Sequence, residues 1–267
     1  MIAPPSHVRL AWRLLARRWA SIGPPFRPSP ADLAVYREHL GALRGDRILL
    51  LGSTPELRDL AASLGIASVT LVDMDRTVAA AMDRFVTTAD RRHETLVVDD
   101  WSRMEFPAGS FGAVVGDLVW HWIRASRRAV VRDRIERFLR PGGLFISRFR
   151  LIPDVDPDRL ALRHPRSALN ALHMLLHVTV GRALLPSVNA NQTRADILAL
   201  FEAGFTLVDE ARPGAHPILV FRRHGGLRAP PIPPIAASGR PGIAGAPLET
   251  TRPSPSTVRA GQSVKPG

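Results

Sequence analysis

The stretch ILLLGSTPEL, residues 48–57, places a short apolar run directly before a glycine turn and the start of a helix. Consecutive aliphatic residues are typical of a strand that is buried on both faces, as strands of parallel sheets are. Gly52 lets a ligand approach the backbone closely, and the helix that follows directs free N–H groups toward the same point. The stretch therefore predicts a strand, turn and helix with a ligand-binding edge, although a single glycine here is also common in ordinary packing.

Short apolar runs continue to alternate with helical stretches after this unit. Such alternation predicts βαβ units and a parallel sheet that is covered on both faces. The last two strands are joined by five residues, too few for a parallel crossover, so they should form an antiparallel hairpin at the sheet edge. The expected strands are 48–51, 68–72, 95–98, 113–116, 144–148, 205–211 and 217–223, and the expected helices between them are 56–64, 76–88, 129–139 and 193–203.

Residues 1–43 predict two further helices. The first carries arginines four apart on one face and apolar residues on another, and it stops at the Gly-Pro-Pro sequence of residues 23–25. The second runs over residues 30–43, with Ser29 as N-cap and Pro30 at the first helical position. We expect both helices to pack on or cap the domain. For the first helix, a membrane-surface anchor or a transit-like segment is the alternative.

The main domain is expected at residues 44–224, with a helical insert at 158–185. Residues 225–267 hold 9 Pro and 7 Gly without a period or a sustained apolar pattern. A segment of this composition cannot bury enough apolar surface to fold. We therefore expect a disordered basic tail.

The composition limits the function classes. A chain of 267 residues with 45% hydrophobic content can form one α/β domain with extensions. The absence of cysteine excludes a disulfide scaffold, a thiolate metal site and cysteine catalysis. No apolar run approaches the roughly 18–20 residues that cross a bilayer, and arginines interrupt the N-terminal segment, so a cytoplasmic protein is expected.

The net charge of +12 lies mostly at the two ends of the chain. Residues 31–224 contain 26 basic and 23 acidic residues, so the expected domain is nearly balanced. A groove that follows nucleic-acid phosphates needs cations clustered on the ordered surface. Nucleic acid is therefore not an expected partner.

Two strand ends carry acidic residues at informative places. Asp73 ends the second strand, 21 residues after Gly52. A carboxylate at this distance from a glycine turn is placed to accept the hydroxyls of a ribose. An exposed strand end or a helix cap is the alternative for Asp73. Met74 could lie against an adenine face or simply fill the core.

The third and fourth strands also end in polar and aromatic residues. Asp100 could accept a hydrogen bond from the adenine amine, and Trp101 could add an apolar wall, with a charged turn as the alternative. Asp117 ends the fourth strand and is followed by His121 between two tryptophans. Open α/β sheets bind ligands at this carboxyl edge. For His121, an ordinary core or surface histidine is the alternative.

Together with the LRPGG sequence at residues 139–143, these residues resemble the class I S-adenosylmethionine-dependent methyltransferases. The resemblance covers about residues 40–224 and implies a Rossmann-like, mostly parallel seven-stranded sheet with an antiparallel C-terminal edge strand. It implies S-adenosylmethionine as the cofactor. It also implies that the methionine part lies against Gly52, Ser53, Thr54 and Pro55, the ribose against Asp73, the adenine against Met74, Asp100 and Trp101, and the methionine amine near Asp117.

The chain departs from the family pattern in its glycine loop. The usual acidic residue two positions before the first glycine is Leu50, and the second and third glycine positions hold Thr54 and Glu56. A turn with Thr, Pro and Glu nevertheless looks like the one in some bacterial members. The family pattern is therefore present in a glycine-poor form.

The resemblance implies transfer of a methyl group to a nucleophilic O, N or C atom, for which correct positioning of the acceptor supplies much of the acceleration. Asp117 and His121 are the nearest candidate proton acceptors. Aromatic residues and the balanced charge favour a small-molecule acceptor, capped by residues 158–185. His173 and His177 lie four apart without a third carboxylate ligand, so no metal site is expected.

Two other functions remain open at this stage. A nicotinamide-dependent oxidoreductase shares the glycine turn and the strand-end acid, although the G-x-G-x-x-G sequence is missing and the closing hairpin is atypical. A non-catalytic nucleotide-binding module on the same fold is the other. The sequence does not indicate an oligomeric state.

Overall fold

The computed structural model describes residues 13–14, 16–151 and 192–225. All of them belong to the first of the two units into which the chain divides, Met1–Pro230. The second unit, Pro231–Gly267, lies wholly outside the described residues, and so does the expected insert at 158–185.

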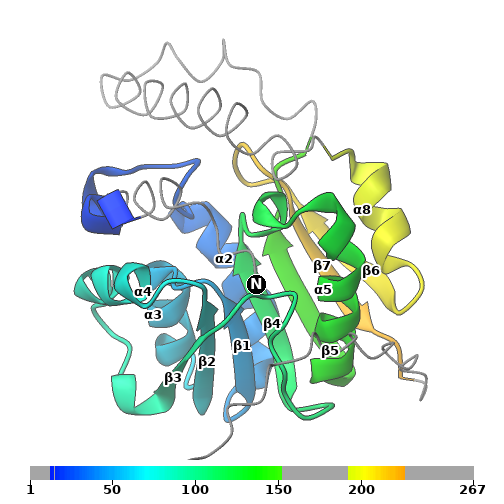
Figure 1. Ribbon diagram of the computed structural model, residues 1–267, viewed down its shortest axis with the longest axis horizontal. Helices are drawn as coiled ribbons and strands as arrows, with labels where there is room; N and C mark the ends of the chain where they lie inside the picture. Colours follow the sequence, from blue (N-terminus) through cyan, green and yellow to red (C-terminus); the bar gives the residue numbers. More distant parts are fainter. Residues whose placement is uncertain (1–12, 15, 152–191, 226–267) are drawn as a thin grey trace, which may run out of the picture. The chain divides into compact units, whose positions relative to one another are not determined.

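Seven strands form one sheet in the order β3-β2-β1-β4-β5-β7-β6 (Figure 1). β1 to β5 pair in parallel, whereas β7 is antiparallel to both β5 and β6. This confirms the expected fold class, with one refinement: β7 pairs back onto β5, so the antiparallel C-terminal strand lies one position inside the edge. The strands are β1 (Arg47–Leu51), β2 (Ser68–Asp73), β3 (Glu94–Val98), β4 (Phe111–Asp117), β5 (Leu139–Arg148), β6 (Phe205–Ala211) and β7 (Ile218–Arg223).

The helices lie close to the expected ranges. Figure 1 shows α3 and α4 beside the β3-β2-β1 half of the sheet and α5 and α8 beside the other half. The α-helices are α2 (Pro30–Leu40), α3 (Pro55–Ser63), α4 (Arg76–Met82), α5 (Ala125–Phe138) and α8 (Arg194–Phe201). The 3-10 turns are η1 (Trp19–Ser21), η2 (Gly41–Leu43), η3 (Asp83–Phe85), η4 (Arg91–His93) and η5 (Trp120–Trp122).

One helix is clearly shorter than its sequence pattern suggests. The expected helix 76–88 ends as α4 at Met82 and continues as a 3-10 turn. The carboxylate of Asp59 on α3 accepts the backbone N–H groups of Thr87, Thr88 and Ala89. These bonds satisfy the backbone outside a helix, so the tertiary contact overrides the local helical pattern.

The sheet is buried on both faces, as its apolar strands require. Leu49 and Leu51 of β1 belong to the core cluster beneath α5 and α8, whereas Ile48 and Leu50 belong to the cluster beneath α2 and α3. This alternation is the two-residue period of a strand between two helical layers. The carboxyl ends of β1 to β4 therefore lie between two packed helical layers.

The LRPGG sequence lies at the start of β5, directly after α5. β5 begins at Leu139, which pairs with Phe111, and the next pair along is Leu144 with Ala113. The intervening residues 140–143 leave the ladder, with Gly142 at a φ of 74°. These residues form a bulge within β5, so the strand begins earlier than the expected range of 144–148.

The segment before α2 packs on the β2 side of the sheet. Trp19 and Ile22 form a small core with Met82 of α4. Arg13 lies 3.0 Å from the carboxylate of Asp75, which caps α4. The segment is thus attached to the helix that follows β2.

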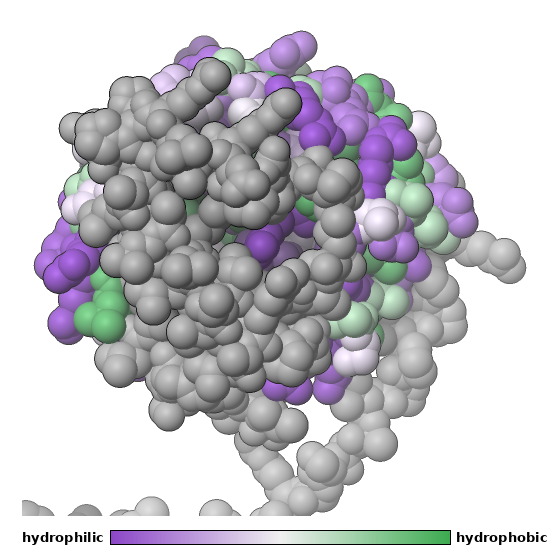
Figure 2. Space-filling view, turned by 90° about the horizontal axis from the view of Figure 1, so that it is seen from above, coloured by the Kyte–Doolittle hydropathy of each residue, from purple (hydrophilic) through white to green (hydrophobic). Residues whose placement is uncertain are grey.

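No helix among the described residues is long and apolar enough to cross a membrane. Among the residues that Figure 2 colours, hydrophilic ones predominate, and the hydrophobic areas are small and separate. Leu14, Val98 and Val208 are the exposed large hydrophobic residues of the described part of the chain.

Candidate functional site

The turn after β1 leaves open space at its glycine. Gly52 has a φ of 88°, and its N–H donates to the carbonyl of Val72 at 2.9 Å. A Cβ added at this position would meet no atom within 4 Å. The left-handed backbone favours glycine, and the open space gives a ligand access to the turn. Thr54 occupies the N-cap position of the following helix without a side-chain capping bond, and Pro55 begins the helix.

Asp73 lies beside this turn. The hydroxyl of Ser53 donates to its carboxylate at 2.7 Å, and the N–H of Asp75 donates to its other oxygen at 3.1 Å. Burial raises the pKa of Asp73, while the hydrogen bonds from Asp75 and Ser53 act in the opposite direction. The structure therefore brings the predicted ribose carboxylate and the glycine turn together. Met74, next to it, is half-buried.

Trp101 lies at the same edge. Its indole N–H donates at 2.8 Å to the carbonyl of Val72, the oxygen that also accepts the N–H of Gly52. Asp100 holds its own turn, because one carboxylate oxygen accepts both the N–H and the hydroxyl of Ser102 at 2.8 Å. Both side chains are half-buried. The ends of β1, β2 and β3 thus form one continuous surface.

Asp117 has a different environment from the one expected. Its two carboxylate oxygens accept hydrogen bonds from Arg148 at 2.7 and 2.9 Å, and the two side chains are 2% and 1% exposed. Burial opposes the charge of the guanidinium, yet the carboxylate of Asp117 raises the pKa of Arg148. A carboxylate held in this way is poorly placed to take a proton from an acceptor. The geometry therefore disfavours the catalytic role that the sequence suggested for Asp117.

His121 lies in the short turn η5 after β4. Its ring stands 4.9 Å from the ring of Trp122, and the residue is 9% exposed. Trp120 belongs to the core and packs against Phe145, Phe149 and Phe201. Of the predicted aromatic group, Trp120 is therefore structural.

Three residues at this edge were not predicted from the sequence. Tyr36 is the only tyrosine of the chain, and its hydroxyl bridges the ends of β4 and β5. Arg148 ends β5, and His216 precedes β7; both are buried. A cation directly after the apolar run of β5 was a usable signal for Arg148. Neither the periodicity of α2 nor the short turn between β6 and β7 gave a signal for Tyr36 or His216.

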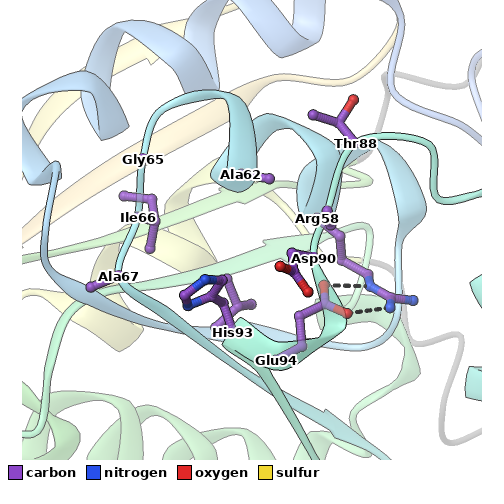
Figure 3. A pocket seen from close by; sticks show the side chains of 11 residues that line it. Arg58, Ala62, Gly65, Ile66, Ala67, Thr88, Asp90, His93 and Glu94 are labelled. Carbon is purple, nitrogen blue, oxygen red and sulfur yellow. Dashed lines mark hydrogen bonds and ion pairs between the residues drawn. The ribbon is translucent and has the colours of Figure 1, made fainter.

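A cavity of about 360 Å³ lies elsewhere, at the amino ends of β2 and β3 (Figure 3). Its lining includes Ala67, Val69, Asp90 and His93, and the ion pair of Arg58 with Glu94 forms part of its wall. Gly52, Asp73 and Asp100 follow the opposite, carboxyl ends of their strands. This cavity is therefore separate from the candidate site.

The sheet order and the site define a class of protein. The strand order reverses between β1 and β4, and Gly52 and Asp73 lie at the carboxyl edge beside this point. Open α/β sheets bind nucleotide cofactors in the crevice at such a switch point. The chain is thus a Rossmann-like α/β protein with an edge suited to a nucleoside.

Comparison with known families indicates the reaction type of this domain. Residues 51–147 match the family model described as a methyltransferase domain. The match runs from the last residue of β1 to Ser147 near the end of β5, and it includes Gly52, Asp73 and Trp101. No curated protein sequence matches the chain.

Solved structures share the fold. An S-adenosylmethionine-dependent methyltransferase from Mesorhizobium loti is 16% identical, with a TM-score of 0.53 over 73% of this chain and 99% of that one. The N-methyltransferase NodS from Bradyrhizobium japonicum, in complex with S-adenosyl-L-homocysteine, is 11% identical, with a TM-score of 0.51 over 80% and 98%. A Rhodobacter sphaeroides structure assigned by name only to the Zn-dependent alcohol dehydrogenases is 18% identical, with a TM-score of 0.55 over 80% and 97%.

At these identities the structures establish the fold alone, so the dehydrogenase name carries no activity over to this chain. The domain match together with the shared fold makes residues 51–147 a methyltransferase domain with the Rossmann-like fold of the class I S-adenosylmethionine-dependent methyltransferases. S-adenosylmethionine is the cofactor that this domain assignment implies.

Proposed function

We propose that this enzyme methylates a nucleophilic O, N or C atom of a small-molecule acceptor. The observation that carries the site assignment is the Ser53–Asp73 hydrogen bond beside the open space at Gly52. It joins a carboxylate suited to ribose hydroxyls with a turn that a ligand can approach. The bound cofactor supplies an electrophilic methyl group on a sulfonium.

In this proposal, different residues at the carboxyl edge bind different parts of the cofactor. Asp73 accepts the ribose hydroxyls, and the half-buried Trp101 and Asp100 border the adenine, with Met74 beside them. The remaining, methionine part extends over the turn of Gly52, Ser53, Thr54 and Pro55. The order β3-β2-β1-β4 fits this arrangement, because the turn after β1 lies between the end of β2, which carries Asp73, and the end of β4.

The acceptor is assigned to the side of β4 and β5. His121 is the proton acceptor that we favour, because the carboxylate of Asp117 is held by Arg148. An imidazole suits proton transfer near neutral pH. The rings of His121 and Trp122 offer aromatic surface of the kind that lines small-molecule sites.

The proposal is tested in two steps. Calorimetric titration with S-adenosylmethionine and S-adenosylhomocysteine should show binding to the purified full chain. The protein is then incubated with methyl-labelled S-adenosylmethionine and either the small-molecule or the macromolecular fraction of a cell extract. Label in the small-molecule fraction supports the proposal. Label only in protein or nucleic acid contradicts the acceptor class, and absence of cofactor binding contradicts the whole assignment.

A further inference from the structure

Arg148 is attached to the end of β4 by its backbone as well as by its side chain. Besides the two guanidinium bonds to Asp117, its carbonyl accepts the N–H of Leu118 at 3.1 Å. Its own N–H donates to the hydroxyl of Tyr36 at 3.0 Å, and that hydroxyl donates to the carbonyl of Gly116 at 2.7 Å. Arg148 thus binds Asp117 and Leu118 directly, and it binds Gly116 through the hydroxyl of Tyr36.

The third guanidinium nitrogen extends the same network to α2. Nη1 of Arg148 lies 3.2 Å from the carboxylate of Asp32, whose side chain is 2% exposed. Asp32 also closes the capping box at the start of α2. The position of Arg148 is therefore fixed from two elements, and buried charged bonds of this kind resist displacement.

The turn that Arg148 holds is strained. Leu118 has a φ of 52°, and among the described residues it is the one non-glycine with a positive φ. The left-handed region costs an L-residue roughly 1–2 kcal/mol, and such strain persists only where the surroundings impose it. Here the carbonyl of Arg148 accepts the N–H of Leu118, while Tyr36 and the Arg148 guanidinium bind the two residues before it. Strain of this kind is characteristic of functional sites.

The strained turn neighbours the open space at the glycine turn. Gly116 pairs with Leu51, the residue directly before Gly52. The turn therefore lies across β1 from Asp73, on the side that the order β2-β1-β4 assigns to the methionine part of the cofactor. Leu118 itself is half-buried, so part of it faces outward at this edge.

We propose that Arg148 is a positioning residue for methyl transfer, which acts by holding the turn at Leu118 against the methionine part of the cofactor. The inference rests on the cofactor placement under the proposed function. Arg148 itself touches no cofactor in this scheme. Its contribution is preorganisation: a turn fixed before binding need not be ordered by the ligand.

The test compares two ligands that differ at the methionine end. S-adenosylhomocysteine carries the amino-acid part, and 5′-methylthioadenosine lacks it. Arg148→Lys keeps the charge but loses the two-pronged contact with Asp117. Leu118→Gly removes the strain and frees the turn. Calorimetry should show S-adenosylhomocysteine binding weakened about tenfold or more in both variants, with methylthioadenosine binding within about twofold of the parent.

Arg58→Lys is the matched control. Arg58 is also buried and also pairs with carboxylates, those of Glu94 and Asp83, but its partner Glu94 begins β3 at the opposite edge of the sheet. This variant should lose stability while the ratio of the two dissociation constants stays unchanged. The melting temperature of Leu118→Gly should not fall, since relief of strain offsets the lost side chain.

Equal weakening of both ligands in Leu118→Gly, or no weakening of either, overturns the positioning role. The binding of Leu118→Gly is sufficient for this conclusion even if Arg148→Lys does not fold. Failure of the unsubstituted protein to bind either ligand overturns the proposed cofactor site instead, so the two failures are distinguishable.

Discussion

The hydroxyl of Ser53 donates to the carboxylate of Asp73 at 2.7 Å, and this bond joins the turn after β1 to the end of β2. The two residues are 20 positions apart in the chain. The carbonyl of Val72, the residue before Asp73, accepts both the N–H of Gly52 and the indole N–H of Trp101. Three strand ends therefore present their polar groups as one surface.

Asp73→Ala should weaken binding of S-adenosylmethionine by about 1–3 kcal/mol, because the ribose hydroxyls lose a charged acceptor. Calorimetric titration measures the change. Asp90→Ala, at an acidic residue near the amino end of β3, is the control and should bind like the parent. Unchanged affinity of Asp73→Ala would contradict the ribose assignment.

Two substitutions of Trp101 should have different effects on the free energy of unfolding and on cofactor affinity. Trp101→Phe keeps an aromatic wall but loses the 2.8 Å bond to Val72, which should cost about 1 kcal/mol of unfolding free energy in urea titrations. Its cofactor affinity should stay close to that of the parent. Trp101→Ala removes the wall and should weaken cofactor binding by about 1 kcal/mol or more. An affinity of Trp101→Ala equal to that of the parent would argue against adenine at this position.

Glu56 should anchor the segment before α2. Its carboxylate accepts the indole N–H of Trp19 at 2.9 Å and the Nε–H of Arg27 at 2.7 Å. Glu56→Ala should therefore lower the unfolding free energy by about 1–3 kcal/mol and speed tryptic cleavage at Arg17 and Arg18. Glu38→Ala, at an exposed residue of α2, serves as the control. Equal cleavage rates in the two variants would mean that the anchor lies elsewhere.

His216 should make the fold sensitive to mild acid. Burial, followed by the charge of Arg148, lowers the pKa of this histidine to about 4 from an ordinary 6.5. The unfolded chain therefore binds the proton first, and stability falls as the pH drops from 6.5 toward 4. The loss at pH 5 relative to pH 8 should be about 2 kcal/mol.

Denaturant unfolding of His216→Leu at the two pH values checks this expectation. The variant should show a smaller difference between pH 8 and pH 5, because the titrating group is gone. A matched substitution at the exposed His93 controls for the change of residue type. A pH dependence identical to that of the parent would show that His216 is not the group responsible.

The order of strands and helices followed from local patterns. The apolar runs at 48–51 and 68–72 fit strands buried on both faces, and their burial in β1 and β2 confirms it. The short link between the last two strands required a hairpin, which β6 and β7 form. Helix ends were less accessible, because the capture of residues 87–89 by Asp59 depends on a contact between separate elements.

For the candidate site too, some features could be predicted from the sequence and others could not. Spacing alone placed Gly52 and Asp73 at one edge, since parallel strands of similar length end together. It could not show that Asp117 is taken by Arg148, because the two residues meet only when β4 and β5 pair.

The sequence by itself thus determined the sheet, its carboxyl edge and the side chains at each strand end. The tertiary structure alone decided which of those side chains are engaged. Partners such as Tyr36 and Arg148 come from distant parts of the chain, and their hydrogen bonds and burial exist only once the elements have packed.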